Sequence, residues 1–360
     1  MSRLFAMRAL LLGLLLSAAT CPGGVRWGAV NSQPTEWYAS DEARAMAANV
    51  IGYQQPAGGW PKNRDMTRPR LAEPAVPRAP GDPADPNAPT IDNGATTTQI
   101  EFLARVHTAT GDAAAREAAL RGIDYLLVAQ YPNGGWPQFY PLRAGYYSRI
   151  TYNDNAMTHV LEVLRGVRDA RPPYAWADPA RRKGAEFAIE RAIDCLLKTQ
   201  VRQDGRLLGW CAQHDENTLA PAWARNFEPP SLSGNESVAL ARFLMTIERP
   251  TPEVVAAIEG AVAWLEASRI TGLRVETFTA ADGERDRRAV ADPSAPPLWA
   301  RFYELGTNRP IFLGRDRVVR YDYNEIERER RLGYAYLGDW PQRLLERDYP
   351  QWRAKHGRKP

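Results

Sequence analysis

A repeated pattern of a helix, a glutamine and a glycine–tryptophan turn constrains the fold of this chain more than any other feature. Apolar residues at helical spacing lead to Gln54, Gln130 and Gln200, which lie 76 and 70 residues apart. Each glutamine is followed by glycine and then by a tryptophan, at Trp60, Trp136 and Trp210. A recurring period of this kind is typical of supersecondary units that stack on one another to bury a common core.

A second set of helices is predicted between the glutamines. Residues that can cap a helix precede apolar stretches of helical period at Asp92, Asp154 and Ser233. Each interval therefore holds two helices, and paired helices that alternate in this way build an α/α toroid. The sequence predicts an all-α fold, an (α/α)3 toroid of paired helices with long loops and a few short strands.

Prolines mark the main interruption of this pattern. Seven prolines fall between residues 67 and 90, and a helix cannot survive that spacing, so we expect a long loop there. Apolar residues make up 44% of the 360, which suffices for one large core. We expect a single toroid domain over residues 30–356, closed by a helix over residues 340–355.

The N-terminus predicts export. Residues 1–20 combine positive charge, the apolar run Ala9–Leu16 and small residues, as a secretory signal peptide does, and the run is too short to span a membrane. We expect a secreted protein, extracellular or periplasmic, with no membrane segment in the mature form; a lipoprotein anchored through Cys21 is the less favoured alternative. After export Cys195 and Cys211 could form a disulfide or remain buried thiols.

The charge of the chain excludes some partners. The formal net charge is +4, and two of these charges lie in the predicted signal peptide. A nucleic-acid-binding protein needs a concentrated basic face, so no nucleic-acid partner is expected. An acidic polymer remains possible, since a few arginines in a cleft suffice to attract it. The four histidines are scattered and form no zinc motif.

Two polar clusters stand at the predicted starts of neighbouring helices. They are Asp92–Gly94 and Asn153–Asn155, and helix starts on one side of a toroid can converge. Carboxylate and amide oxygens are ligands that suit Ca²⁺, so Asp92, Asp154 and Asn155 are candidate metal ligands. The alternative is that each aspartate only caps its helix.

Arginines concentrate in two rigid loops. Arg225 lies in a stretch rich in aromatic residues and proline, and Arg301, Arg309 and Arg315 lie close together further along. A forked guanidinium matches a carboxylate, which favours binding of a polyuronate; ordinary surface ion pairing is the alternative.

Taken together, the motifs of this sequence resemble those of the pectate lyases of polysaccharide lyase family ten. The resemblance runs from about Gly52 to Trp340 and rests on long motifs in order: Gly58–Asn63, Ile91–Thr96, Asn133–Gln138, Thr151–Met157, Trp210–Asp215, Glu228–Ser231, Thr307–Phe312 and Gly314–Asp316. The resemblance implies an (α/α)3 toroid, calcium and polygalacturonate as the substrate.

The resemblance also implies roles for individual residues. Asp92 and Asp154 match acidic positions that hold calcium against the substrate carboxylate. Arg225 matches the arginine taken as the Brønsted base, and Arg309 matches a second arginine that grips the substrate. Further candidates for substrate binding are Lys62, Arg149, His214, Tyr303, Arg315, Trp60 and Trp136. We expect a monomer.

The implied reaction is calcium-dependent anti β-elimination on de-esterified polygalacturonate, which gives 4,5-unsaturated oligogalacturonates. An inverting glycoside hydrolase on the same fold is an alternative, and it would use two carboxylates from Asp215, Glu216 and Glu228. A non-catalytic pectin-binding protein and a lyase for another uronate also remain open.

Overall fold

The computed structural model describes residues 24–71, 79 and 81–356. The predicted signal peptide (residues 1–20) and Cys21 lie outside the described residues, so export and the lipoprotein alternative remain predictions.

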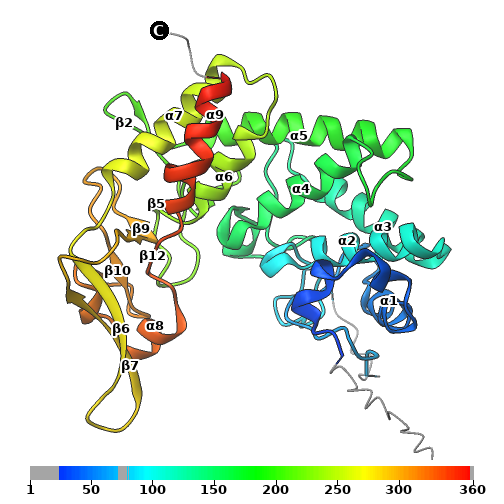
Figure 1. Ribbon diagram of the computed structural model, residues 1–360, viewed down its shortest axis with the longest axis horizontal. Coiled ribbons are helices and arrows are strands. Elements are labelled where there is room, and N and C mark those ends of the chain that lie inside the picture. Colours follow the sequence, from blue (N-terminus) through cyan, green and yellow to red (C-terminus); the bar gives the residue numbers. More distant parts are fainter. Residues whose placement is uncertain (1–23, 72–78, 80, 357–360) are drawn as a thin grey trace, which may run out of the picture.

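Helices are the main regular structure of the described chain, and they pack in two layers. Each of the hairpins α2–α3, α4–α5 and α6–α7 contributes one helix to each layer, and α1 joins the layer of α3, α5 and α7. The three hairpins agree with the predicted pairing. In Figure 1 they follow one another from α1 to α7 as an open arc, so the helices do not close into a ring. The α-helices are α1 (Asp41–Tyr53), α2 (Thr97–Thr110), α3 (Ala113–Ala129), α4 (Ala156–Arg168), α5 (Pro179–Thr199), α6 (Glu236–Met245), α7 (Pro252–Ala267), α8 (Arg328–Gly333) and α9 (Tyr349–His356).

Shorter helical segments lie at the ends and turns of this arc. The predicted closing helix is present as η7 followed by α9, and η7 packs on α6. The short segments are η1 (Trp27–Ser32), η2 (Thr35–Ala39), η3 (Asp92–Gly94), η4 (Tyr146–Ser148), η5 (Asn153–Asn155), η6 (Tyr323–Glu325) and η7 (Leu344–Asp348).

The repeated glutamine joins each hairpin to the next. α1, α3 and α5 end one residue before Gln54, Gln130 and Gln200. Each side-chain amide donates to a backbone oxygen of the following helix in the same layer, and these bonds are Gln54 to Ala118 at 2.9 Å, Gln130 to Ala188 at 2.8 Å and Gln200 to Ala257 at 2.8 Å. The repeat in the sequence is therefore a repeat of interfaces between units.

The tryptophan of each repeat anchors the following turn to its own helix. The three indoles are fully buried, and each N–H donates to a helix carbonyl: Trp60 to Val50 at 2.7 Å, Trp136 to Leu126 at 2.7 Å and Trp210 to Leu196 at 2.8 Å. In the first two repeats, a glycine two residues before the tryptophan lets the turn approach the next helix. At Gly134, with φ +92°, a Cβ atom would lie 2.0 Å from the backbone oxygen of Arg191.

A β-rich lobe follows α7, and it is larger than the all-α prediction allowed. β6 and β7 are seven-residue strands that form an antiparallel hairpin in which Val275 pairs with Ala289, and four consecutive charged residues begin β7. The strands are β1 (Ile150–Thr151), β2 (Arg202–Gln203), β3 (Arg206–Leu207), β4 (Gln213–His214), β5 (Leu232–Ser233), β6 (Leu273–Thr279), β7 (Arg285–Ala291), β8 (Trp299–Ala300), β9 (Phe302–Tyr303), β10 (Phe312–Leu313), β11 (Val319–Arg320) and β12 (Leu337–Gly338).

This C-terminal lobe, residues 269–338, has its own hydrophobic cluster. Phe302, Phe312, Tyr323 and Tyr336 are among its buried members, apart from the larger cluster between the helical layers. Pairing of β5 with β9 fastens the lobe to the start of α6. The lobe therefore lies at a fixed position beside the starts of α4 and α6.

Three further expectations concern single features. The described part of the proline-rich stretch over residues 67–90 contains no helix, as predicted. Cys195 and Cys211 are both buried and free, so the disulfide alternative is wrong. Among the described helices, none has the length and apolar character needed to cross a bilayer.

Candidate active site

The two Asp-Asn clusters form short turns that lie side by side in front of α2 and α4. Asp92 belongs to η3 and Asp154 to η5, and the two turns are in contact. Neither aspartate side chain caps its helix, so the capping interpretation is wrong for both. Asn93, Asp154 and Asn155 instead have left-handed φ values of 53°, 51° and 61°. Backbone strain of this kind is found at functional sites.

Arg301 reaches Asp154 from the C-terminal lobe. Its Nη2 donates to Asp154 Oδ1 at 3.0 Å and to Asn153 Oδ1 at 3.1 Å. The residue stands between β8 and β9, and its backbone N–H donates to the Tyr336 oxygen at 2.7 Å. Because both flanking strands are paired, the guanidinium is held in place, with only 7% of the side chain exposed.

Glu236 is a further member of this cluster and contacts both Arg301 and Asp154. It begins α6, is fully buried, and receives Arg301 Nη2 on Oε1 at 2.5 Å. The same oxygen accepts the backbone N–H of Asp154 at 3.3 Å, and Ser233 donates to the other oxygen. Burial tends to lower the pKa of Arg301, but the charges of Glu236 and Asp154 outweigh it and raise the pKa, so Arg301 stays charged.

Sequence reasoning missed Glu236, although a signal was present. Ser233–Glu236 occupies the third helix start, in the place that Asp92–Gly94 and Asn153–Asn155 hold at the first two. The starts of α2, α4 and α6 thus contribute one acidic residue each to the same region: Asp92, Asp154 and Glu236.

Asp92 lies beside Lys62. The lysine donates to Asp92 Oδ2, and its ammonium lies 5.7 Å from the centre of the Phe139 ring. The other carboxylate oxygen, Asp92 Oδ1, is buried and has no hydrogen-bond partner among the described residues, and the same is true of Asn155 Oδ1. Acceptors left without donors in this way are costly unless a ligand or an ion satisfies them.

These orphaned oxygens fit a hard cation such as Ca²⁺. Asp92, Asp154 and Asn155 supply carboxylate and amide oxygens only, and 38% of the Asp154 side chain is exposed. Within the described ranges, no three His, Cys, Asp or Glu side chains are close enough to form a metal site without other ligands. A cation here would therefore rely on amide oxygens and on oxygens brought by a substrate.

Arg225 lies in the loop before α6. Its Nε donates to Glu228 Oε2 at 2.8 Å and its Nη2 to Glu228 Oε1 at 2.5 Å, and its guanidinium lies 4.8 Å from the centre of the Phe227 ring. Burial tends to lower the pKa of Arg225, but the hydrogen bonds and charge of Glu228 outweigh burial and raise the pKa. Arg225 is therefore a charged group in the free protein.

Tyr334 connects Arg225 to Arg301. Its hydroxyl donates to Glu228 Oε1 at 2.9 Å, and the Arg301 guanidinium lies 4.8 Å from its ring centre, against 5.7 Å for Arg225. Burial raises the pKa of Tyr146 of η4, and the charges of Arg225 and Glu228 also act on this residue. The predicted base and the Asp154 cluster are thus two parts of one site.

Four predicted substrate-binding residues are buried and need correction. Trp60 and Trp136 have no exposed surface, so neither can stack on a sugar ring. Tyr303 donates its hydroxyl to the Ser268 oxygen at 2.7 Å in the core. His214 is also fully buried, where burial lowers its pKa to about 4. These residues build the fold.

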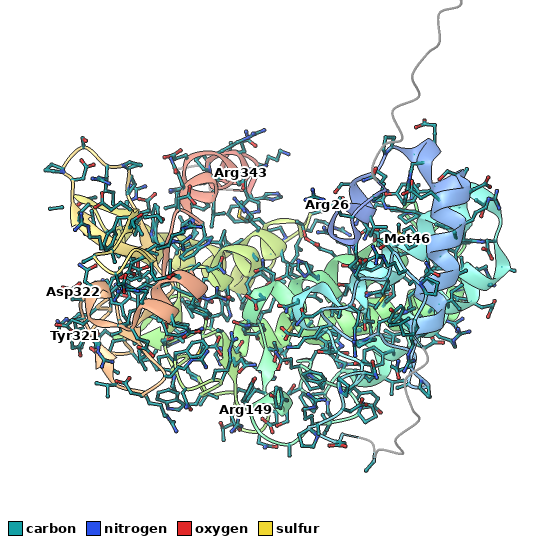
Figure 2. All side chains as sticks on the ribbon, turned by 90° about the horizontal axis from the view of Figure 1, so that it is seen from below. Arg26, Met46, Arg149, Tyr321, Asp322 and Arg343 are labelled. Carbon is teal, nitrogen blue, oxygen red and sulfur yellow. The ribbon has the colours of Figure 1, made fainter. Side chains whose placement is uncertain are left out.

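The remaining predicted arginines have other partners. Arg149 forms ion pairs with Asp215 and Glu216, the latter at 2.9 Å. Arg315 pairs with Glu329 at 3.0 Å. Arg309 lies 3.6 Å from the centre of the Tyr321 ring, which Figure 2 places at the edge of the C-terminal lobe. Arg301, and not Arg309, is therefore the arginine that contacts Asp154.

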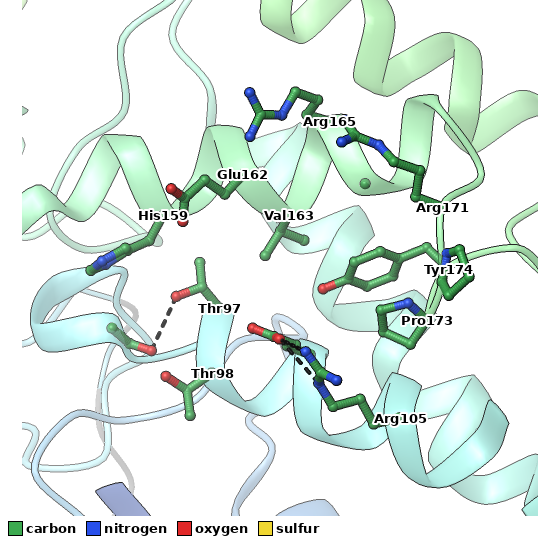
Figure 3. Close-up of a pocket in the computed structure, with 14 residues that line it drawn as sticks. Thr97, Thr98, Arg105, His159, Glu162, Val163, Arg165, Arg171, Pro173 and Tyr174 are labelled. Atoms are coloured by element: carbon green, nitrogen blue, oxygen red, sulfur yellow. Dashed lines mark hydrogen bonds and ion pairs between the residues drawn. The ribbon is translucent and has the colours of Figure 1, made fainter. Parts of the chain in front are cut away.

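A separate pocket of about 460 Å³ lies between α2 and α4 (Figure 3). Thr97, His159 and Tyr174 line it, together with the ion pair Arg105–Glu101. It contains none of the predicted site residues.

The helical arc and a cluster of acidic, amide and arginine side chains at its helix starts define a polysaccharide lyase. The chain belongs to the pectic acid lyase family, whose sequence model matches residues 54–345. Among curated protein sequences, no relative matches this chain.

Two solved structures are similar to this one. A family 10 polysaccharide lyase from Cellvibrio cellulosa is 33% identical with a TM-score of 0.74, and the match covers 90% of this chain and 94% of that chain. A mutant of the family 10 polysaccharide lyase from Cellvibrio cellulosa, in complex with trigalacturonic acid, is 32% identical with a TM-score of 0.74, and the match covers 93% and 100%.

Proposed function

We propose that this protein is a secreted pectate lyase that cleaves de-esterified polygalacturonate by calcium-dependent anti β-elimination. The observation that carries the proposal is the cluster of Asp154, Arg301 and Asp92, in which carboxylates suited to calcium and a guanidinium suited to a uronate carboxylate are held in place before a substrate arrives. The complex of a similar lyase with trigalacturonic acid supports an acidic polysaccharide as the substrate. We further propose a monomer with a catalytic domain over residues 30–356 that keeps the pairing of an (α/α)3 toroid.

Calcium would be held by Asp92, Asp154 and Asn155. When bound, it supplies positive charge next to the substrate carboxylate, which lowers the energy of the carbanion formed at C5. Arg301 supplies a second positive charge at the same place, because Glu236 and Asp154 keep it protonated. Lys62 keeps one Asp92 oxygen occupied and leaves the other free.

Arg225 is the proposed Brønsted base. It would take the C5 proton; the C4–O bond then breaks, a C4=C5 double bond forms, and water protonates the departing oxygen. A base must first be deprotonated, and Glu228 opposes this by raising the Arg225 pKa. Positive charge gathered around the substrate acts in the other direction. The reaction should therefore speed up as the pH rises into the alkaline range.

The direct test is ultraviolet absorbance during incubation with polygalacturonate at alkaline pH, first with calcium and then with a chelator. We expect absorbance of the unsaturated product to rise with calcium and to stop with the chelator. New reducing ends without absorbance would instead show an inverting hydrolase. Binding without cleavage would show a pectin-binding protein, and activity only on another uronate would overturn the assignment of the substrate.

A matched variant tests the calcium ligands without relying on activity. Asp154→Asn keeps the shape of the side chain and removes its charge, so calcium affinity measured by calorimetry should fall at least about tenfold. Asp282→Asn removes an exposed aspartate on the β6–β7 turn and should leave affinity unchanged. Equal affinity in the two variants would exclude Asp154 as a calcium ligand.

A further inference from the structure

Arg317 adopts a backbone conformation that arginine rarely takes. Its φ is +64°, in the left-handed region, and its side chain is exposed. Glycine accepts this conformation without cost, whereas a residue with a Cβ atom loses roughly 1 kcal/mol. An arginine that persists at such a position on the surface suggests a use for its side chain.

The Arg317 guanidinium is placed by an aromatic ring instead of a carboxylate. It lies 4.3 Å from the centre of the Trp223 ring. Among the described residues it forms no ion pair or hydrogen bond, unlike Arg225, Arg301 and Arg315. Stacking holds the plane of a guanidinium and leaves its N–H donors, which point outward in that plane, free for an anion.

Trp223 is itself held firmly. It is half-buried and packs against the hydrophobic cluster of the C-terminal lobe. Its indole N–H makes no hydrogen bond within the part of the chain that the structure describes, and the nitrogen is not fully buried. The pair thus offers a fixed apolar surface, a free indole donor and a free cation, a combination that suits a sugar acid.

The pair adjoins the active site through two loops. Trp223 is two residues before Arg225, so their Cα atoms are at most about 7 Å apart. Arg317 is two residues after Arg315, whose backbone oxygen accepts the side-chain amide of Asn226 at 3.4 Å. Arg225 and Arg315 both approach the Phe227 ring, at 4.8 and 5.8 Å. Trp223 and Arg317 therefore lie next to Arg225 and Arg315 along the chain, and their two loops are in contact.

We propose that Arg317 and Trp223 form a subsite for the carboxylate of a galacturonate unit outside the cleavage centre. This inference rests on the proposed function and extends it to the length of substrate that the enzyme prefers. Polygalacturonate has one carboxylate per sugar, so a longer chain presents a carboxylate to Arg317 while another unit occupies the site of Asp154 and Arg301. The subsite improves binding of long chains and takes no part in bond breaking.

The test is Arg317→Gly, assayed on trigalacturonate and octagalacturonate. Glycine suits the left-handed backbone, so thermal unfolding should show equal or higher stability. We expect KM for the octamer to rise about tenfold with kcat unchanged, from loss of one charge-assisted contact. The ratio of octamer to trimer kcat/KM should fall by the same factor.

The control is Asp204→Gly, which makes the same kind of backbone change at φ +49° in the turn between β2 and β3. It should leave the octamer-to-trimer ratio unchanged. A stable Arg317→Gly protein with the wild-type ratio would overturn the subsite. Failure of the wild type to form unsaturated product would contradict the proposed function instead, so the two failures are distinguishable.

Discussion

The side-chain amide of Gln130 donates to the backbone oxygen of Ala188 at 2.8 Å, and this single bond links the turn after α3 to the middle of α5. The same amide donates to the Gly134 oxygen at 2.9 Å, and the Gln130 side-chain oxygen accepts a hydrogen bond from Arg191. One side chain thus connects a helix end, its turn and the next hairpin.

Replacing Gln130 should therefore lower stability without changing catalysis. Gln130→Met keeps the length of the side chain but leaves the buried Gly134 carbonyl without its donor, at a cost of about 1–3 kcal/mol for a group left unpaired, and leaves the Ala188 carbonyl only its hydrogen bond within α5. We expect the free energy of unfolding in urea to fall by about 2 kcal/mol, with KM unchanged. Gln342→Met, at a half-buried glutamine whose amide donates only to the exposed Glu346, is the control and should be neutral. A changed KM with intact stability would contradict this structural role.

Glu236→Gln should destabilise the protein more strongly. It leaves the buried Arg301 with less opposing charge, and breaking a buried ion pair costs about 3–5 kcal/mol. The measurement is urea unfolding. The double variant Glu236→Gln/Arg301→Met supplies the control: stability should partly return because no unpaired charge remains, while activity stays lost. If the two single effects simply add, Glu236 and Arg301 are not coupled.

Glu228→Gln should move the pH dependence of the reaction. Glu228 raises the pKa of Arg225, so its neutral replacement should lower that pKa. If deprotonated Arg225 is the base, the rising limb of kcat/KM against pH shifts to lower pH. Glu329→Gln removes the carboxylate that pairs with Arg315 and should leave the limb in place. An unmoved limb in Glu228→Gln would exclude Arg225 as the titrating group.

His214 should make the fold sensitive to mild acid. Its Nδ1 lies 2.9 Å from the Leu219 oxygen and its Nε2 accepts the Cys211 N–H at 3.2 Å, so both ring nitrogens are satisfied in the neutral form. Burial lowers its pKa to about 4, from 6.5. Below pH 6.5 the His214 side chain binds a proton in the unfolded chain but not in the folded protein. The free energy of unfolding therefore falls as the pH drops towards 4, by up to about 3 kcal/mol.

The check is urea unfolding of the wild type and of His214→Gln at pH 7.5 and pH 4.5. The wild type should lose more stability than the variant between these two values, because glutamine has no proton to gain. Equal losses would show that His214 is not the cause.

The helical part of the fold could be predicted because its signals are local. The helices end beside Gln54, Gln130 and Gln200, and the tryptophan turns follow where expected. The β-rich lobe was underestimated, because strands of two residues, such as β8 and β9, are defined by partners far along the chain. The open arc also depends on packing that periodicity does not encode.

The site was predicted in part for the same reason. Asp92 and Asp154 share a visible motif, so their proximity could be anticipated. Which of Arg301, Arg309 and Arg315 reaches Asp154 depends on the docking of the C-terminal lobe, and sequence spacing does not contain that information. Trp60 and Trp136 were misassigned because a tryptophan beside glycine and proline looks like a surface platform, whereas here its indole N–H binds a helix carbonyl.

The contact between Asp154 and Arg301 spans 147 residues of sequence, whereas each hairpin packs mainly on its neighbours. Local units of this kind can form early while the chain is still being synthesised, but long-range docking comes late. A nascent chain that already displays Asp92 and Asp154 still lacks Arg301 until the C-terminal lobe has emerged. Catalytic competence therefore appears only after the C-terminal lobe has docked against the starts of α4 and α6.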